Sequence, residues 1–325
     1  MDPLTHFFDG PRAVGAFALS MHMSAPWGVN VCDNAALTVL AVTKGRARVD
    51  GTLLQFGDVA LIRGPEPYSV TDAAGNAPSI EIGPGQRCTS LDGRDLRDEL
   101  RHGIRRWGNA ADGETALLIG TYERPDEAGG LVTRALPRLA IVQSEHADGA
   151  LVSLLANELA HNDPAAQVVV DRLLDVLVVG TIRRWLNSTD RPAEGTWLTC
   201  NDPLIVRALE CLHAEPAAPW TVESLARRVN TSRASLAARF RTSVGEPPMA
   251  YLTRWRLTLA GDLLQAPGST VSGVARTVGY YNAYAFSTAF KRQVGTTPTE
   301  YRQRRPTLSP GPVPLKESSH QGSFI

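Results

Sequence analysis

The chain has 325 residues, of which 43% are hydrophobic and 20% charged, as in ordinary globular proteins that hold two cores. No segment approaches the ~20 uninterrupted apolar residues of a membrane helix, and the N-terminus lacks the basic and apolar regions of a signal peptide. The four cysteines form no CxxC, which argues against a disulfide framework or a zinc finger and suits a reducing compartment. We therefore expect a cytoplasmic protein with no membrane partner.

The net charge of zero hides an asymmetry along the chain. Residues 1–202 carry 18 Lys and Arg against 26 Asp and Glu, whereas residues 203–305 carry 14 against 6. A basic region joined to an acidic one is expected where only one of them meets a polyanion. Charge alone does not distinguish that explanation from chance.

Residues 14–83 predict short strands separated by turns. Asp50-Gly51 favours a tight hairpin turn between two of them. Many short strands with regular turns indicate a small barrel or sandwich. The polar segment 84–113 predicts a loop. Strands are expected, among others, at 37–42, 46–49, 59–62, 116–122 and 138–142.

From about Leu151 the spacing of apolar residues becomes helical. The second of two expected helices runs to about Leu186, and its stripe fits either packing on the barrel or pairing with a second copy of the chain. Residues 188–201 have the composition of a linker, and 306–325 that of a disordered tail. The first apolar stripe comprises Leu151, Leu154, Leu155 and Leu159, and the second Val169, Leu173, Val176, Leu177 and Ile182.

An internal repeat in residues 221–305 is the most informative feature of the sequence. The segment 222–229 matches 271–278 at an offset of 49, and from Leu236 and Phe286 onward the offset is 50. The one-residue insertion falls in a turn, where it costs least. Each copy predicts a helix, a short turn, a second helix and a capped third helix.

The ends of these helices carry recognisable signals. Thr221, Thr270 and Ser232 are expected N-caps, and Asn230 and Gly279 are expected in the turns, because these residue types tolerate a left-handed backbone. Residues 297–300 read as a capping box, Asp202-Pro203 starts a helix in the same way, and a long helix should join the copies over about 247–264. Two helices crossing through a tight turn form a helix-turn-helix unit, and two in tandem are far more specific than one. A structural helical bundle is the alternative.

These residues resemble the DNA-binding domain of the AraC/XylS family of transcription regulators, from about Asp202 to Arg305. The N-terminal region is similar to the cupin sensor domain of many such regulators, through residues 23–28 and the Gly57-Asp58 turn. The resemblance implies an α+β protein with a cupin-like β-barrel followed by helices (1–187), a linker (188–201), an all-α double helix-turn-helix domain (202–305) and the tail (306–325). The matching residues include Leu225, Ala226, Ser232, Leu236, Phe240, Gly245, Pro248, Tyr251, Arg256, Ala275, Gly279, Tyr280, Phe286, Phe290, Gly295, Pro298 and Tyr301.

Helical geometry predicts which side chains face outward, and the family resemblance implies that these outward positions approach DNA. Leu236 with Phe240, and Phe286 with Phe290, lie four apart and face the core. Arg233 and Asn282 are the best candidates for reading bases, and the basic residues further along would hold phosphates. The full set of candidates for DNA contact is Arg233, Ala234, Ala237, Ala238, Arg239, Arg241, Asn282, Ala283, Tyr284, Ser287, Thr288, Lys291 and Arg292.

The N-terminal region lacks the ligands of an enzymatic cupin. No His-x-His occurs in the chain, and Tyr68 stands where a ligand histidine would be expected. We therefore expect no catalytic residue, no metal and no cofactor, and instead a small organic effector near Trp27, Arg46, Arg48 and Tyr68. A redox pair of Cys32 and Cys88 is an alternative, although lone cysteines are more often buried hydrophobes.

The hypothesis that follows is a transcription regulator that binds duplex DNA, answers to a small molecule and forms a homodimer. If it is an activator, RNA polymerase is a further partner. The competing hypotheses are a cupin enzyme with a structural helical region and a DNA-associated protein that responds to a protein partner.

Overall fold

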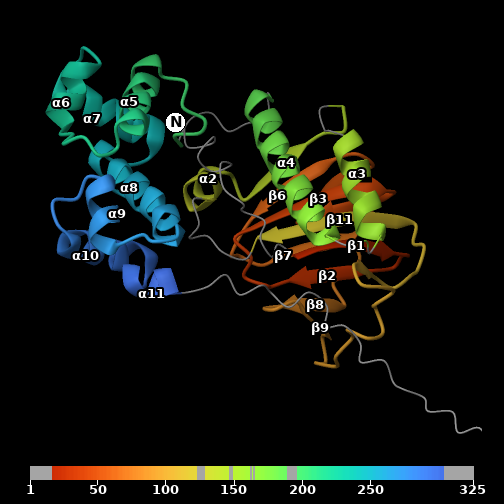
Figure 1. The fold of residues 1–325 in the computed structure, drawn as a ribbon. Coiled ribbons are helices and arrows are strands. Elements are labelled where there is room, and N and C mark those ends of the chain that lie inside the picture. Colours follow the sequence, from red (N-terminus) through yellow and green to blue (C-terminus); the bar gives the residue numbers. More distant parts are fainter. Residues whose placement is uncertain are drawn as a thin grey trace, which may run out of the picture.

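A computed structural model describes residues 17–122, 129–145, 149–161, 163, 165–188 and 196–303. Its N-terminal part contains two six-stranded sheets with helices beside them, and its C-terminal part is helical (Figure 1). The predicted α+β class is thereby confirmed. Two predicted segments lie outside the described residues, namely 189–195 within the linker and the whole tail, 306–325. Among the described residues no helix has the length and hydrophobicity to span a membrane.

The strands form two separate ladders. The first sheet has the order β10-β1-β11-β3-β6-β12 and the second the order β5-β4-β7-β2-β8-β9. The strands are β1 (Phe17–Met23), β2 (Gly28–Val31), β3 (Leu37–Lys44), β4 (Arg46–Val49), β5 (Thr52–Gln55), β6 (Val59–Arg63), β7 (Tyr68–Asp72), β8 (Ile80–Gly83), β9 (Arg87–Ser90), β10 (Arg106–Trp107), β11 (Thr115–Tyr122) and β12 (Leu139–Val142).

The first sheet is buried on both faces. Along β3, Leu40 and Val42 belong to a core shared with the second sheet, whereas Val39 and Ala41 belong to a core shared with helices. Successive side chains of a strand point to opposite faces, so this strand is a continuous apolar run. The predicted strand 37–42 is present as β3, which continues to Lys44, and strands 46–49, 59–62, 116–122 and 138–142 also appear within one residue of their expected bounds.

The predicted hairpin turn is present between β4 and β5. Asp50 and Gly51 have φ angles of 44° and 80°, the left-handed pair that a type I′ turn requires. The prediction of a loop over 84–113 was wrong in part, because β9 and β10 lie there. Cys88 of β9 is buried in the core between the sheets together with Leu96 and Leu100. Three isolated apolar residues in a polar segment give no periodic signal, and only the partner strand β8 reveals the pairing.

Helices α3 (Gly149–Ala160) and α4 (Ala166–Asn187) lie side by side over the first sheet (Figure 1). Only part of each predicted apolar stripe is buried. Leu155, Leu159, Leu177 and Ile182 are buried as expected, but Leu154, Val169 and Val176 are 52%, 42% and 54% exposed. The buried face of α4 instead runs through Val170, Leu174, Leu177, Val178, Ile182 and Trp185. Helix α4 therefore has a second, exposed apolar row.

The C-terminal part contains the two predicted helix-turn-helix units, joined by the long helix α8. Figure 1 shows α5, α6 and α7 at one end of α8 and α9, α10 and α11 at the other. The helices are α5 (Pro203–Ala214), α6 (Val222–Arg228), α7 (Arg233–Val244), α8 (Pro248–Gln265), α9 (Val271–Thr277), α10 (Ala283–Val294) and α11 (Pro298–Gln303).

The expected helix ends are confirmed in both units. Thr221, Ser232 and Thr270 each accept a hydrogen bond from the backbone three residues on, and Asn230 and Gly279 have φ angles of 58° and 84°. The capping box at 297–300 is present, as is the Asp202 cap of α5. Each unit has its own hydrophobic core, the first around Phe240 and the second around Phe290.

The loop 216–218 joins the two units. The guanidinium of Arg256 on α8 donates to the carbonyl oxygens of Pro216 and Ala218, at 2.6 and 2.7 Å. From the other side, Gly279 in the turn of the second unit lies so close that a Cβ on it would be 2.7 Å from the backbone oxygen of Ala217. Glycine is therefore required at 279 twice over, for its positive φ and for this approach.

The two parts of the chain also touch one another. Helix α2 (Gly129–Ala135), which the sequence did not predict, contacts α8, and Figure 1 shows it between the sheets and the helical part. Trp197 packs both against the core between the first sheet and its helices and against the core of the first helix-turn-helix unit. This indole joins the two parts.

Gly279→Ala should destabilise the second unit more than Gly295→Ala. Both glycines have a positive φ, 84° and 82°, which costs a residue with a Cβ about 1–2 kcal/mol. Only Gly279 adds a backbone contact, because nothing lies within 4 Å of a Cβ at 295. We expect backbone hydrogen exchange in α9 and α10 to be faster in Gly279→Ala than in Gly295→Ala. Equal acceleration in the two variants would contradict the role of the 216–218 loop.

Candidate nucleic-acid interface and sensor cavity

In the first unit, α7 presents a row of small and basic side chains to solvent. Leu236 and Phe240 are fully buried, as predicted. The ring of Phe240 packs edge to face on Tyr251 of α8, with centroids 5.9 Å apart. The opposite face carries the candidates for DNA contact. Arg233, Ala234, Ala238, Arg239 and Arg241 are exposed and Ala237 is half-buried.

In the second unit, α10 is positioned in the same way. Phe286 and Phe290 are fully buried, and Phe290 packs edge to face on Tyr301 of α11 with centroids 5.3 Å apart. The Asn282 carboxamide oxygen accepts from the Ala285 backbone N–H at 2.8 Å, which commits that oxygen to the cap. Of the remaining candidates, Tyr284, Thr288, Lys291 and Arg292 are exposed and Ala283 and Ser287 are half-buried.

Tyr281 is the residue of this surface that the sequence analysis missed. It is 97% exposed, and its neighbour Tyr284 is 83% exposed. The signal was present in the sequence as the one-residue slip of the repeat. Tyr280 donates its backbone N–H to Ala275 as Thr231 does to Ala226, and the caps then match Asn282 to Ser232. Tyr281 is therefore the inserted residue.

The basic side chains of α7 differ in how they are held. The Arg239 guanidinium donates two hydrogen bonds to the Asp202 carboxylate, at 2.8 and 2.5 Å. The pair keeps the pKa of Asp202 below its ordinary value, with the backbone N–H groups at the start of α5 contributing further. Arg239 is thus already paired with a carboxylate.

The four predicted effector residues do not surround one space. Trp27 and Tyr68 are buried in the core between the sheets, where the Tyr68 hydroxyl lies 3.4 Å from the Thr38 hydroxyl and burial raises the Tyr68 pKa. Ala47 and Val49 of β4 point into that same core, so the alternation of β4 places Arg46 and Arg48 on its outer face. Arg48 there donates to the backbone oxygens of Ala73 and Gly51.

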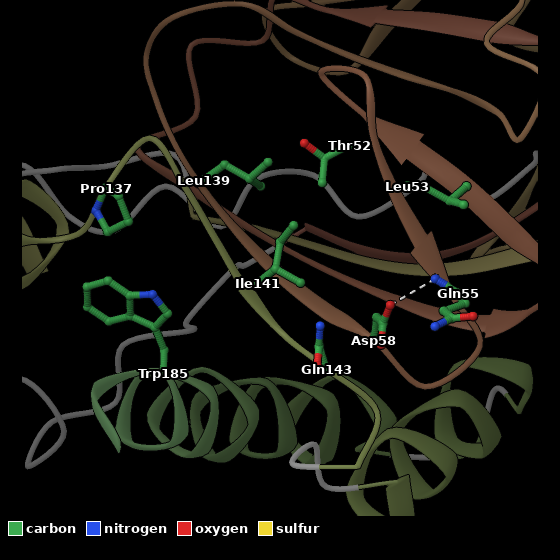
Figure 2. Close-up of a pocket in the computed structure, with 9 residues that line it drawn as sticks. All are labelled: Thr52, Leu53, Gln55, Asp58, Pro137, Leu139, Ile141, Gln143 and Trp185. Atoms are coloured by element: carbon green, nitrogen blue, oxygen red, sulfur yellow. Dashed lines mark hydrogen bonds between the residues drawn. The ribbon is translucent and has the colours of Figure 1, made fainter. Parts of the chain in front are cut away.

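A cavity of about 570 Å³ opens elsewhere, between the edge strand β5 of the second sheet and the edge strand β12 of the first. Leu139 and Ile141 reach it from the core between the sheets. Figure 2 shows the indole of Trp185, at the end of α4, beside Pro137 at one side of this space. The lining residues are Thr52, Leu53, Gln55, Asp58, Pro137, Leu139, Ile141, Gln143 and Trp185.

One of the polar groups of the cavity, the Asp58 carboxylate, is already hydrogen-bonded within the protein. The Asp58 carboxylate accepts from the backbone N–H groups of Gln55 and Ser144, at 2.9 and 2.8 Å, and Figure 2 draws the first of these bonds. The side-chain amides of Gln55 and Gln143 and the Thr52 hydroxyl complete the polar set. A lining that combines apolar side chains with a few polar groups suits a small molecule that is partly apolar.

The remaining reactive side chains form no centre of their own within the described ranges. No group of three or more His, Cys, Asp or Glu side chains there could hold a metal ion. Burial raises the pKa of the Cys88 thiol to about 11 and also raises that of Cys32. A redox pair needs a thiolate, so these shifts weaken the redox alternative.

Comparison with known proteins covers both parts of the chain. Residues 2–187 match the cupin family and residues 225–304 match a helix-turn-helix domain. An AraC-like transcription regulator of Streptomyces lividans is 30% identical over 318 residues, covering 95% of this chain and all of that protein. The transcriptional regulator AlkR of Acinetobacter baylyi is 29% identical over 318 residues, which is 94% of this chain and all of AlkR.

Among solved structures, the DNA-binding domain of the global transcriptional factor AdpA in complex with a target DNA is similar to the C-terminal part. It is 32% identical, covers 33% of this chain and 99% of that one, and has a TM-score of 0.31.

Arg241→Ala should lower the salt dependence of DNA binding more than Arg239→Ala does. Each phosphate contact contributes about 0.9 to the slope of log affinity against log salt. Arg241 is exposed, whereas Arg239 is bound to Asp202. We expect a slope reduced by about 1 for Arg241→Ala and by clearly less for Arg239→Ala, measured by fluorescence anisotropy on a fixed duplex. The reverse order would show that Arg239 leaves Asp202 to bind a phosphate.

Proposed function

Because the chain belongs to the AraC-like transcription regulators that carry a cupin domain, we propose that it reads two neighbouring stretches of one DNA duplex with α7 and α10. The observation that carries the proposal is the matched exposure of the two helices. Each buries two side chains four residues apart and turns small, polar and basic ones outward. Selection of bound sequences from a random duplex library tests it, because two sequence-dependent half-sites should emerge about one helical turn apart.

Within this interface we assign some side chains to phosphate contacts and others to base contacts. Arg241, Lys291 and Arg292 hold phosphates, and Arg233 and the Asn282 amide nitrogen donate to base edges. The alanine methyl groups of α7 contact thymine methyl groups. The negative charge of residues 1–202 keeps that part of the chain away from the phosphates.

We further propose that the cavity between β5 and β12 binds a small-molecule effector. Its size and its mixed lining of apolar side chains, two amides, a hydroxyl and the Asp58 carboxylate support a small ligand with both apolar and polar groups. The positions of Trp27, Arg46, Arg48 and Tyr68, on two faces of the second sheet, favour this cavity over a site that all four residues share. Trp27 and Tyr68 then act as core residues.

The exposed apolar row of α4 supports a homodimer. Val169 and Val176 are exposed seven residues apart on the helix, and Val168 beside the first of them is 59% exposed, whereas Leu173 between them is half-buried against the core. Leu154 on α3, a helix that contacts α4, is also exposed. A row of this kind pairs readily with a copy of itself across a two-fold axis.

The remaining proposals concern the setting in which the protein works. Its relatives are regulators rather than enzymes, and we propose that this chain has no catalytic activity. We place it in the cytoplasm, where bacterial DNA lies, with RNA polymerase as a partner if it activates transcription. We also propose the predicted domain limits: a sensor domain at 1–187, a linker at 188–201 and a DNA-binding domain at 202–305.

Val176→Glu should weaken the homodimer by at least tenfold. The substitution puts a charge into an apolar contact, where an unpaired charge is costly. Val206→Glu on α5, whose valine is 36% exposed, is the matched control and should leave the assembly unchanged. Sedimentation velocity over a range of concentrations measures the effect. Dissociation that is identical in wild type and Val176→Glu would place the dimer contact elsewhere.

Ile141→Trp should fill the cavity and abolish ligand binding. Small molecules are screened by thermal shift on the wild-type chain, and a ligand at 100 times its Kd stabilises the folded state by about 2.7 kcal/mol. We expect this shift to disappear in Ile141→Trp and to persist in Leu91→Trp, a substitution at a site that is 69% exposed. A ligand whose shift survives Ile141→Trp binds at another site.

A further inference from the structure

Two tyrosines at the start of α10 are exposed to an extent that the fold does not explain. Tyr281 and Tyr284 are 97% and 83% exposed, more than any other large apolar side chain among the described residues. Leaving an aromatic ring in water forgoes about 1.5–3 kcal/mol of burial. Neither ring contributes to a hydrophobic core, so their surface is free for a partner.

The first unit has no counterpart to this pair. Tyr281 is the inserted residue of the second unit, and the position that matches Tyr284 in α7 is Ala234. An exposed alanine therefore stands in α7 where α10 carries the Tyr284 ring. Helices α7 and α10 have the same length and each buries two anchors four residues apart, but they present different chemistry to the partner.

The pair continues the row of side chains that faces outward from α10. Tyr284, Thr288 and Lys291 are spaced by four and three residues along one face and all are exposed. Tyr281 precedes this row directly, beside the Asn282 cap. The rings therefore lie at the helix end that enters the major groove in a helix-turn-helix complex.

We propose that Tyr281 and Tyr284 read thymine in the half-site of the second unit. Each ring packs on a thymine C5 methyl group, an apolar contact available in the major groove, and the phenol hydroxyl stays at the polar rim. This inference rests on the proposed DNA contact of α10. It adds the base that α10 selects, thymine, and the two side chains that select it.

A neutral ring leaves a signature that distinguishes it from a basic side chain. The salt slope of binding counts the phosphates that Lys and Arg neutralise, and tyrosine neutralises none. Loss of the rings should therefore weaken binding without changing the slope. Substitution should also leave folding unaffected, because the two side chains make no core contact.

The test begins with sequences selected from a random duplex library by the full wild-type chain. On the best duplex, the double variant Tyr281→Ala, Tyr284→Ala should bind at least tenfold more weakly with the wild-type salt slope and an unchanged unfolding temperature. Leu91→Ala, at a side chain that is 69% exposed in the N-terminal part, is the control and should bind as wild type does. Sequences selected by the double variant should lose base preference in one half-site and keep it in the other.

Replacing thymine by deoxyuridine in that half-site removes only the methyl group. It should weaken the wild type and have no further effect on the double variant. Three results would overturn the proposal: affinity of the double variant within twofold of wild type, a changed salt slope, or equal sensitivity of both proteins to deoxyuridine. Failure of the wild-type chain to select any duplex would overturn the DNA contact itself, which is a different result from failure of the tyrosine pair.

Discussion

An edge-to-face contact between two aromatic rings fixes each recognition helix, and the rest of the interface depends on it. Phe240 packs on Tyr251 in the first unit, and Phe290 packs on Tyr301 in the second, with interplanar angles of 66° and 77°. Such pairs contribute about 0.5–1.5 kcal/mol beyond the burial of their area. Because a helix has a fixed rotation per residue, anchoring one face determines which side chains meet DNA. The two contacts are 50 residues apart in the chain and are the same interaction used twice.

A second constraint sets the two anchored helices relative to each other. The loop 216–218 is held by Arg256 from α8 and is approached closely by Gly279 from the second unit. Long helices such as α8 bend over their length. A second contact between the two units, through the loop 216–218, therefore limits how far one unit can move relative to the other. A regulator that reads two stretches of one duplex needs this rigidity, since a misplaced half would lose its contacts.

The sequence predicted those parts of the fold whose signals are local. Caps, left-handed turn residues and apolar spacing place Thr221, Asn230 and the anchors Leu236 and Phe240 without knowledge of any partner element. The failures arose where burial depends on distant residues. Cys88 is buried because β8 pairs with β9, and the apolar spacing of α4 does not reveal which of its two rows faces the sheet. The repeat shows that Tyr281 is an inserted residue. Its exposure could not be predicted, because exposure depends on which elements surround the residue in the folded protein.

The wall of the cavity and the junction between the two parts of the chain share one packed cluster. Trp185 lines the cavity from the end of α4, and the same hydrophobic core includes Trp197, Leu198 and the buried face of α4. Trp197 also packs on the first helix-turn-helix unit, where its ring meets His213 edge to face at 6.3 Å between centroids. Packed cores shift between discrete arrangements rather than deforming continuously. Because Trp185 and Trp197 belong to one such cluster, a rearrangement of Trp185 would reach the contact between Trp197 and the first helix-turn-helix unit.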